Sequence, residues 1–261
     1  MFTKYNKRLV LVKEELEKLY RRFNNRKFVH PDPLEFLYEY EDLREREIVG
    51  LLASSLAYGR VSQILLSVSS VLGKMKPSPF VFLMESSLLV LEKTFSDFKY
   101  RFTSGRDLSN LLFNIKSIIE EYGSLELCFM EGFKESDETV IPALVNFSEK
   151  LCSYCYNSLI PLSGGGSAFK RLNLFLRWMV RKDNVDPGGW NKIPPSKLVV
   201  PLDTHMYRIC LAAGFTQRKM IDIQAALDVT ASFKKIEPDD PVKYDFALTR
   251  TAILGNFAST F

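Results

Sequence analysis

Apolar residues recur every three or four positions along most of the chain, which is the spacing of amphipathic helices. In residues 5–23, for example, Leu9, Val12, Leu16 and Leu19 fall on one face and charged side chains fill the other. Runs of β-branched residues are short, as at 197–200, and have no matching run nearby. We therefore expect an all-α fold. Further helices are predicted over 46–72, with a break at 58–59, and over 80–91, 108–122, 140–157, 204–213, 220–233 and 242–254.

The composition is that of a globular protein. The 261 residues, 46% hydrophobic and 25% charged, suffice for one large core or for two lobes that share an interface. No apolar run reaches the length of a membrane span, and the first residues lack the pattern of a secretion signal. We expect a cytoplasmic protein, associated with the nucleoid in a bacterium, whose four cysteines stay reduced.

Positive charge is concentrated in one part of the chain. Residues 163–219 hold ten lysines and arginines against three aspartates, whereas the rest holds 25 basic and 28 acidic residues. A local excess of this kind is typical of a surface that binds a polyanion. A solvated basic face is the alternative interpretation.

Three consecutive glycines, Gly164, Gly165 and Gly166, precede a predicted helix in this segment. Backbone N–H groups of such a run can approach a ligand closely, and the start of a helix carries partial positive charge. The pattern therefore suits a phosphate of a nucleic acid backbone, and a flexible turn without a ligand is the alternative.

Lys170 is the candidate nucleophile. Its neighbours in the predicted helix are largely apolar, and Arg171, Arg177 and Arg181 follow it. Desolvation and nearby positive charge both disfavour the protonated amine, which is the condition for a nucleophilic lysine at neutral pH. A lysine that merely extends over the helix surface is the alternative.

Asp203 is the candidate carboxylate. It follows Pro201 and stands at the start of a predicted helix, where an aspartate accepts hydrogen bonds from first-turn N–H groups. A carboxylate held in this way can also stabilise a positive charge that develops in a cleft, so the two roles are compatible.

The sequence gives little support to a metal site. Cys152 and Cys155 form a CxxC pair without a second close pair, which favours two buried thiols, and His205 has no acidic or histidine partners at ligand spacing. We expect no metal and no cofactor.

The segment VPLDTHMYR at 200–208, with FALTRTAILG at 246–255, resembles the C-terminal part of the helix-hairpin-helix DNA glycosylase superfamily. There a V-D-T-H-V-x-R helix start precedes a late x-A-L-x-x-x-G helix. Residues 47–72 and 100–126 are similar to the opening helix pair and to the segment before the hairpin. The resemblance covers most of 33–255.

The resemblance implies two helical lobes with an active cleft between them. Residues 46–199, including a helix-hairpin-helix-like region at 160–182, would form the middle lobe, and residues 1–45 and 200–261 the other. The family carboxylate corresponds to Asp203 and the lysine of its bifunctional members to Lys170, with Lys182 and Lys197 as alternatives. The long segment between lysine and aspartate is closest in layout to the archaeal 8-oxoguanine glycosylase branch. No cysteine follows Cys210, so the iron–sulfur cluster of the endonuclease III branch is not expected.

The implied function is base excision repair: a DNA glycosylase, with AP-lyase activity, that removes an oxidised purine such as 8-oxoguanine from double-stranded DNA and acts as a monomer. The alternatives are a non-catalytic helical protein that binds distorted or damaged duplex, and a helical interaction module. Expected DNA contacts are Gly164, Gly165, Gly166, Arg171, Arg181, Tyr58 and Arg60, with Tyr58 or a neighbour entering the gap in the base stack. The expected base pocket comprises Trp178, Trp190, Tyr244 and Asp245.

Overall fold

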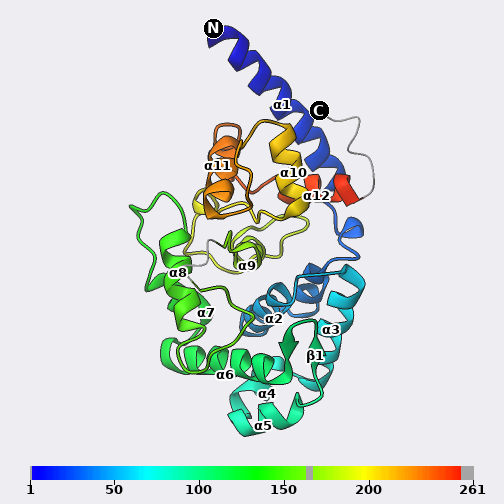
Figure 1. The fold of residues 1–261 in the computed structure, drawn as a ribbon, viewed down its shortest axis with the longest axis vertical. Helices are drawn as coiled ribbons and strands as arrows, with labels where there is room; N and C mark the ends of the chain where they lie inside the picture. The colour runs from blue at the N-terminus through cyan, green and yellow to red at the C-terminus, as the bar shows by residue number, and fades with distance from the viewer. Residues whose placement is uncertain (1, 163–166, 254–261) are drawn as a thin grey trace.

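The computed structural model describes residues 2–162 and 167–253, and the side chains of 12–162 and 167–251. The expected all-α class is confirmed, because the described ranges contain no strands other than the two-residue pair β1 (Lys99–Tyr100) and β2 (Thr103–Ser104) (Figure 1). The helices in chain order are α1 (Phe2–Phe23), η1 (Arg26–Phe28), η2 (Pro33–Glu39), α2 (Leu43–Ser55), α3 (Val61–Lys74), α4 (Pro79–Glu85), α5 (Leu88–Thr94), α6 (Gly105–Tyr122), α7 (Leu125–Met130), α8 (Ile141–Lys150), α9 (Lys170–Val180), η3 (Pro195–Lys197), α10 (Thr204–Ala212), α11 (Ile223–Lys234) and α12 (Asp245–Ile253).

Helix boundaries follow local capping chemistry. The side chain of Ser104 accepts from the N–H of Asp107 and the Asp107 side chain accepts from the N–H of Ser104, which closes a capping box at the start of α6. The same helix ends at Gly123, whose φ of 88° is the left-handed conformation that glycine adopts freely. The predicted helix over 80–91 is two helices, because Ser87 caps a new start for α5.

The central pair of helices is α2 and α9, and α2 also packs against η2 and α4. Gly50 of α2 allows this approach: a Cβ there would lie 3.3–3.4 Å from side-chain atoms of Leu37, Phe175 and Met179. Helix α1 packs on α12, which in turn packs on α10, while α5 and α7 pack on α6. Figure 1 shows α1, α10 and α12 on one side of α9 and α2, α5, α6 and α7 on the other.

The region 160–182 contains a single helix in its described part, α9. Helix α8 ends at Lys150, and the described residues between the two helices form turns and irregular structure. A tight hairpin between two helices is therefore not found in the described part of 160–182. The element that places Lys170 is the start of α9 after a long connection.

One buried carboxyl joins three parts of the core. Glu47 of α2 accepts a hydrogen bond from the indole Nε1 of Trp190 (2.7 Å) and another from the backbone N–H of Leu125 (3.1 Å). Only 2% of Glu47 is exposed, and burial raises its pKa to about 7. The hydrogen bonds act in the opposite direction, because they stabilise the ionised form.

This raised pKa predicts a pH-dependent stability. Between the pKa of the unfolded chain, about 4.5, and about 7, the folded state holds the proton more tightly, so the contribution of Glu47 to stability falls as pH rises. Glu47→Gln does not titrate. We expect the difference in free energy of unfolding, Glu47→Gln minus wild type, to increase by about 3 kcal/mol in favour of the variant between about pH 4.5 and 7.5. Urea titrations at each pH measure it.

Glu126→Gln is the control, since Glu126 accepts from the backbone of Asn191 and Lys192 on the same loop as Trp190 but is only half-buried. Parallel stability curves for Glu47→Gln and wild type would show that burial does not disfavour the Glu47 carboxylate.

Candidate active site

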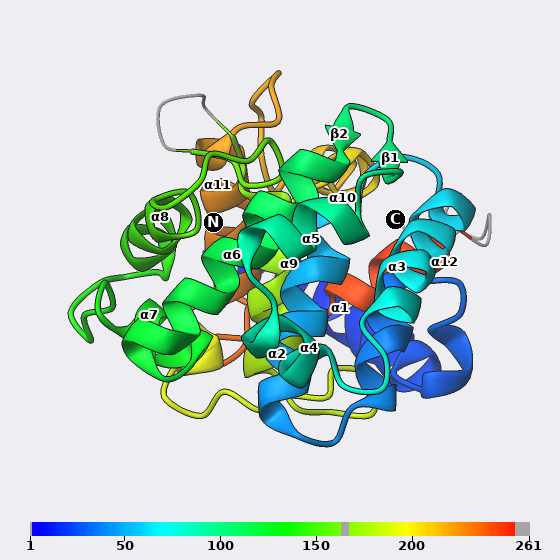
Figure 2. The same cartoon turned by 90° about the horizontal axis from the view of Figure 1, so that it is seen from below.

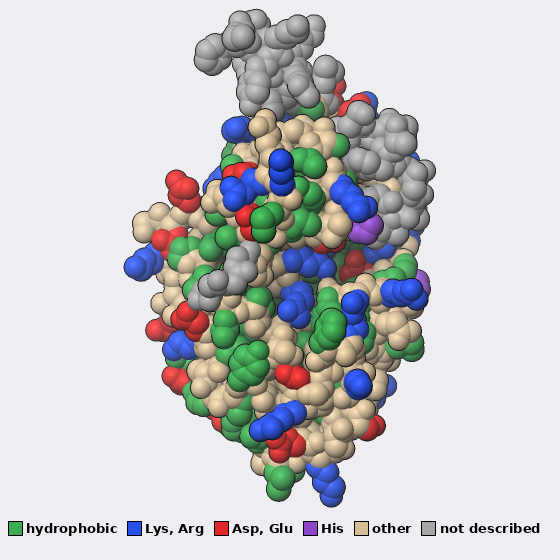
Figure 3. Space-filling model, viewed as in Figure 1, with side chains coloured by type: hydrophobic (Ala, Val, Ile, Leu, Met, Phe, Trp, Pro, Cys, Tyr) green, Lys and Arg blue, Asp and Glu red, His purple; other side chains and the backbone are tan. Residues whose placement is uncertain are grey.

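A cavity of about 320 Å³ is formed by segments that are far apart in the sequence. Its lining includes Asp32 before η2, Lys170 and Trp178 of α9, Asp203 before α10, and Asp245 and Phe246 of α12. Figure 3 shows lysine and arginine side chains gathered in the hollow across the middle of one face of the molecule. The site thus combines acidic, cationic and aromatic groups in one concave space.

Lys170 is the first residue of α9 and is half-buried. The preceding Phe169 has a φ of 49°, a conformation unusual for a residue with a side chain, and turns the chain into the helix. The Lys170 amine donates to the backbone oxygen of Ala57 (3.1 Å), just beyond the end of α2. Burial lowers the pKa of this amine, and the negative charges of Asp203 and other cavity aspartates oppose the shift.

Asp203 is the N-cap of α10, as expected. Its Oδ1 accepts from the backbone N–H of Met206 (2.8 Å), and its side chain is half-buried. Among charged groups, Asp203 exerts the largest influence on the Lys170 amine. The structure therefore brings the predicted lysine and carboxylate to the same cavity.

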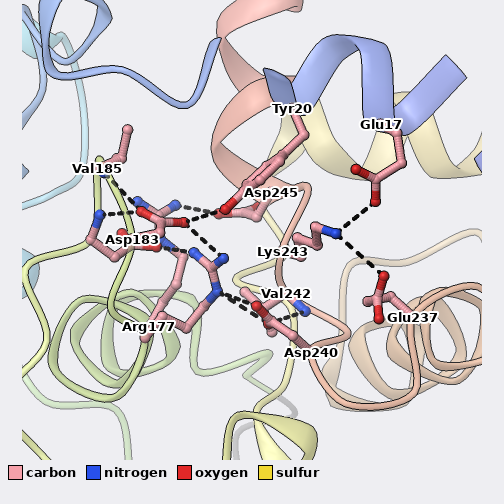
Figure 4. A network of polar contacts seen from close by, with 12 residues as sticks. Glu17, Tyr20, Arg177, Asp183, Val185, Glu237, Asp240, Val242, Lys243 and Asp245 are labelled. Carbon is pink, nitrogen blue, oxygen red and sulfur yellow. Dashed lines mark hydrogen bonds and ion pairs between the residues drawn. The ribbon is translucent and has the colours of Figure 1, made fainter. Parts of the chain in front are cut away.

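Two buried arginines and four aspartates form a network that adjoins the cavity, whose lining includes Arg177 and Asp245 (Figure 4). Arg177 donates to Asp186 (3.1 Å) and to Asp245 (2.5 Å). Arg181 donates to Asp183 (2.9 Å), Asp240 (2.9 Å) and Asp186. Burial raises the pKa of the Asp245 carboxyl to about 6, and Arg177 acts against that shift. The network joins α9 to α12 and so fixes one wall of the cavity.

Of the four expected base-pocket residues, Trp178 and Asp245 border the cavity, although the Trp178 side chain is itself fully buried in the core. Trp190 and Tyr244 do not, and this expectation is corrected. Both are about 1% exposed, with the Trp190 indole bonded to Glu47 and the Tyr244 hydroxyl donating to Glu17 (2.6 Å). These aromatic residues serve the core.

The expected nucleophile alternatives lie elsewhere. Lys182 is exposed and does not line the cavity. The Lys197 amine donates to the backbone oxygens of Glu135 (3.0 Å) and Asp137 (2.5 Å), away from the cavity lining.

The expected DNA contacts divide into four groups. Arg60 is exposed at the start of α3, beside cavity residue Gly59. Arg171 and Tyr58 are half-buried: the Arg171 guanidinium donates to the backbone oxygen of Ser55 (2.9 Å) and lies 5.2 Å from the Tyr58 ring centroid.

The expected DNA contact at Arg181 is wrong. This residue is 4% exposed and its guanidinium is bonded to three aspartates, so it is not accessible to a phosphate. Gly164, Gly165 and Gly166 lie outside the described residues.

Three further cavity residues carry no signal in the sequence. Arg250 Nη2 donates to the backbone oxygen of Val29 (2.7 Å) and to Asp32 (2.9 Å), which joins α12 to the segment before η2. Phe246 adds an aromatic wall. The pairing of Asp32 with Arg250 crosses more than 200 positions, and no local pattern reveals such a contact.

Residues 32–254 match a family model described as "Protein of unknown function (DUF2400)". The chain belongs to the DUF2400 family. No curated protein and no solved structure matches it. The DUF2400 region contains Lys170, Asp203 and Asp245 and begins at Asp32, so it encloses the candidate chemistry of the cavity.

No helix in the described part of the DUF2400 chain is long and apolar enough to span a bilayer. No group of three or more histidine, cysteine, aspartate and glutamate side chains in these ranges is arranged to hold a metal ion. All four cysteines are free thiols.

Proposed function

We propose that this protein is a DNA glycosylase with AP-lyase activity, which removes an oxidised purine such as 8-oxoguanine from duplex DNA. One observation carries the proposal: Lys170, whose pKa burial lowers, and Asp203 line the same cavity. An amine with a lowered pKa and a nearby carboxylate are the two groups that Schiff-base chemistry at a sugar carbon requires. The resemblance of residues 200–255 to helix-hairpin-helix glycosylases supports the same assignment.

In the proposed reaction, the neutral amine of Lys170 attacks C1′ of the damaged nucleotide. The bond between C1′ and the base breaks, and the base leaves with the electron pair and takes up a proton. One amine proton passes to the leaving base and the other to O4′ as the C1′–O4′ bond breaks, which gives an imine. In its protonated form the imine permits loss of a C2′ proton and departure of the 3′ phosphate by β-elimination. Asp203 stabilises the positive charge that develops on the sugar.

The cavity also suits the base that is removed. Phe246 offers an aromatic surface for stacking, and Asp245 offers carboxyl oxygens to polar edges of a purine. A base paired inside a duplex cannot reach a concave site of this kind, so the proposal requires that the nucleotide turn out of the helix.

Borohydride trapping tests the proposal directly. Purified protein is incubated with a duplex that carries one 8-oxoguanine or one abasic site, and borohydride reduces any imine to a stable covalent adduct. We expect an adduct with both substrates. Binding without an adduct would favour the non-catalytic protein that recognises distorted duplex, and binding that does not weaken as salt rises would favour a helical interaction module.

Asp203→Asn removes the negative charge of this residue but keeps a side chain that can cap α10. Asparagine caps helices about as well as aspartate, so the bond from Met206 N–H should persist and the fold should be kept. Loss of the negative charge should slow adduct formation about 100-fold in single-turnover trapping. The matched control is Asp222→Asn, which alters the cap of α11, outside the cavity lining. Equal trapping rates for Asp203→Asn and wild type would remove Asp203 from the mechanism.

A further inference from the structure

Phe102 stands at the tip of the hairpin formed by β1 and β2. The turn consists of Arg101 and Phe102 alone, since Tyr100 pairs with Thr103. The Phe102 side chain is 86% exposed, more than that of any other large hydrophobic residue in the described ranges. Figure 2 shows the hairpin projecting at the edge of the molecule. A large apolar ring is thus held out into water at a projecting point.

Arg101 holds this tip in an unfavourable backbone conformation. Its φ is 52°, whereas Phe102 has no positive φ. Two-residue hairpin turns with a positive φ only at the first position favour glycine there, because a Cβ meets the backbone. Strain of this kind persists where surrounding contacts enforce it, and it often marks a functional position.

The base of the hairpin is fixed by two tyrosines. The Tyr58 hydroxyl donates to the backbone oxygen of Tyr100 (3.2 Å) and pairs with the Thr103 hydroxyl (2.6 Å), while the Tyr100 hydroxyl donates to the backbone oxygen of Tyr58. Their rings lie 4.9 Å apart. The ring and hydroxyl of Tyr58 are therefore committed within the fold, and Tyr58 anchors the tip that Phe102 forms.

The hairpin lies beside the mouth of the cavity. Gly59 lines the cavity, and a Cβ on Gly59 would lie 2.7 Å from Nη1 of Arg101. Two positions earlier, the backbone oxygen of Ala57 accepts from the Lys170 amine. Short contacts thus connect the exposed ring, through Arg101 and the segment 57–59, with the candidate nucleophile.

We propose that Phe102 inserts into the base stack of duplex DNA at the position left by the nucleotide that turns into the cavity. The proposal rests on the proposed function for its partner. An aromatic ring fills the gap between two neighbouring base pairs and stacks on any base, so it keeps the nucleotide out without reading sequence. Arg101, exposed beside the ring, supplies a cation to the adjacent phosphate.

The test compares binding to two duplexes that differ at one position. One carries a tetrahydrofuran abasic analogue opposite 2-aminopurine, and the other is intact. We expect wild type to prefer the first duplex and to raise its 2-aminopurine fluorescence by unstacking. Phe102→Ala should weaken binding to the tetrahydrofuran duplex about tenfold and lose the fluorescence change, while binding to the intact duplex stays within about twofold. Phe102→Trp should restore both.

Leu89→Ala is the matched control, because Leu89 is 74% exposed on α5 and lies outside the cavity lining. Equal affinity of Phe102→Ala and wild type for the tetrahydrofuran duplex overturns the insertion. An equal loss of affinity on both duplexes would indicate a general contact and also overturns the insertion. A wild-type protein that binds both duplexes equally overturns it as well.

A parallel trapping experiment separates this proposal from the enzyme assignment. A single-stranded oligonucleotide with an abasic site has no stack to fill, so Phe102→Ala should form the borohydride adduct there as wild type does. If wild type forms no adduct with any DNA, the glycosylase proposal fails, and the binding preference alone then decides the role of Phe102.

Discussion

Lys170→Gln is expected to reduce borohydride adduct formation by more than about 1,000-fold, because the amide nitrogen of glutamine is not a nucleophile. Glutamine can still donate to the backbone oxygen of Ala57, so the start of α9 should be kept. The measurement is single-turnover trapping on a duplex with an abasic site, with circular dichroism to confirm the fold. The pH dependence should carry a second signature. Burial lowers the pKa of the Lys170 amine, so the neutral fraction, and with it the wild-type rate, should rise with pH and level off below pH 10.5.

Lys182→Gln and Lys197→Gln provide the comparison, since neither lysine lines the cavity. Both should trap at the wild-type rate. An undiminished adduct with Lys170→Gln would assign the chemistry to another amine, and loss of the adduct with Lys182→Gln or Lys197→Gln would identify which one.

Arg177→Met is expected to destabilise the fold by about 3–5 kcal/mol, because it leaves the buried carboxylate of Asp245 without its cation and removes one of the two cations bonded to Asp186. Arg177 is 3% exposed and is the ion-pair partner that Asp186 and Asp245 share. Urea unfolding at neutral pH measures the loss. Adding Asp245→Asn should recover part of it, since that change removes the carboxylate that has lost its cation.

The control for this prediction is Arg218→Met, which breaks an exposed pair with Asp222 (3.0 Å) and should cost less than about 1 kcal/mol. A loss with Arg177→Met no larger than that with Arg218→Met would mean that the buried network does not hold α9 to α12.

Local chemistry explains why much of the fold was predictable. Helical spacing and caps depend on neighbouring residues, and Asp203 occupies the N-cap that its sequence context predicts. The start of α9 lacks such a signal: the apolar pattern predicts Lys170 one turn inside the helix, whereas it is the first residue, after Phe169 in a left-handed conformation without a side-chain cap. The break within the predicted helix over 80–91 was missed, because its apolar spacing continues across Ser86 and Ser87.

The positive charge of residues 163–219, in contrast, does not predict which of its arginines lie at the surface. Two of its arginines, Arg177 and Arg181, are buried and paired with aspartates that include Asp240 and Asp245. These partners lie 59 and 68 positions away along the chain, so a local charge count treats both arginines as surface groups. For the same reason, the sequence does not show that Trp178 and Trp190 are both buried in the core.

The cavity walls come from both ends of the DUF2400 region, from Asp32 near its start to Arg250 near its end. A molecule that fills this space therefore acts as a non-covalent crosslink between distant segments, and it stabilises the folded chain in proportion to its affinity and concentration. Thermal unfolding in the presence of nucleobases, abasic oligonucleotides or unrelated small molecules thus ranks ligands for the site without assuming which reaction occurs there.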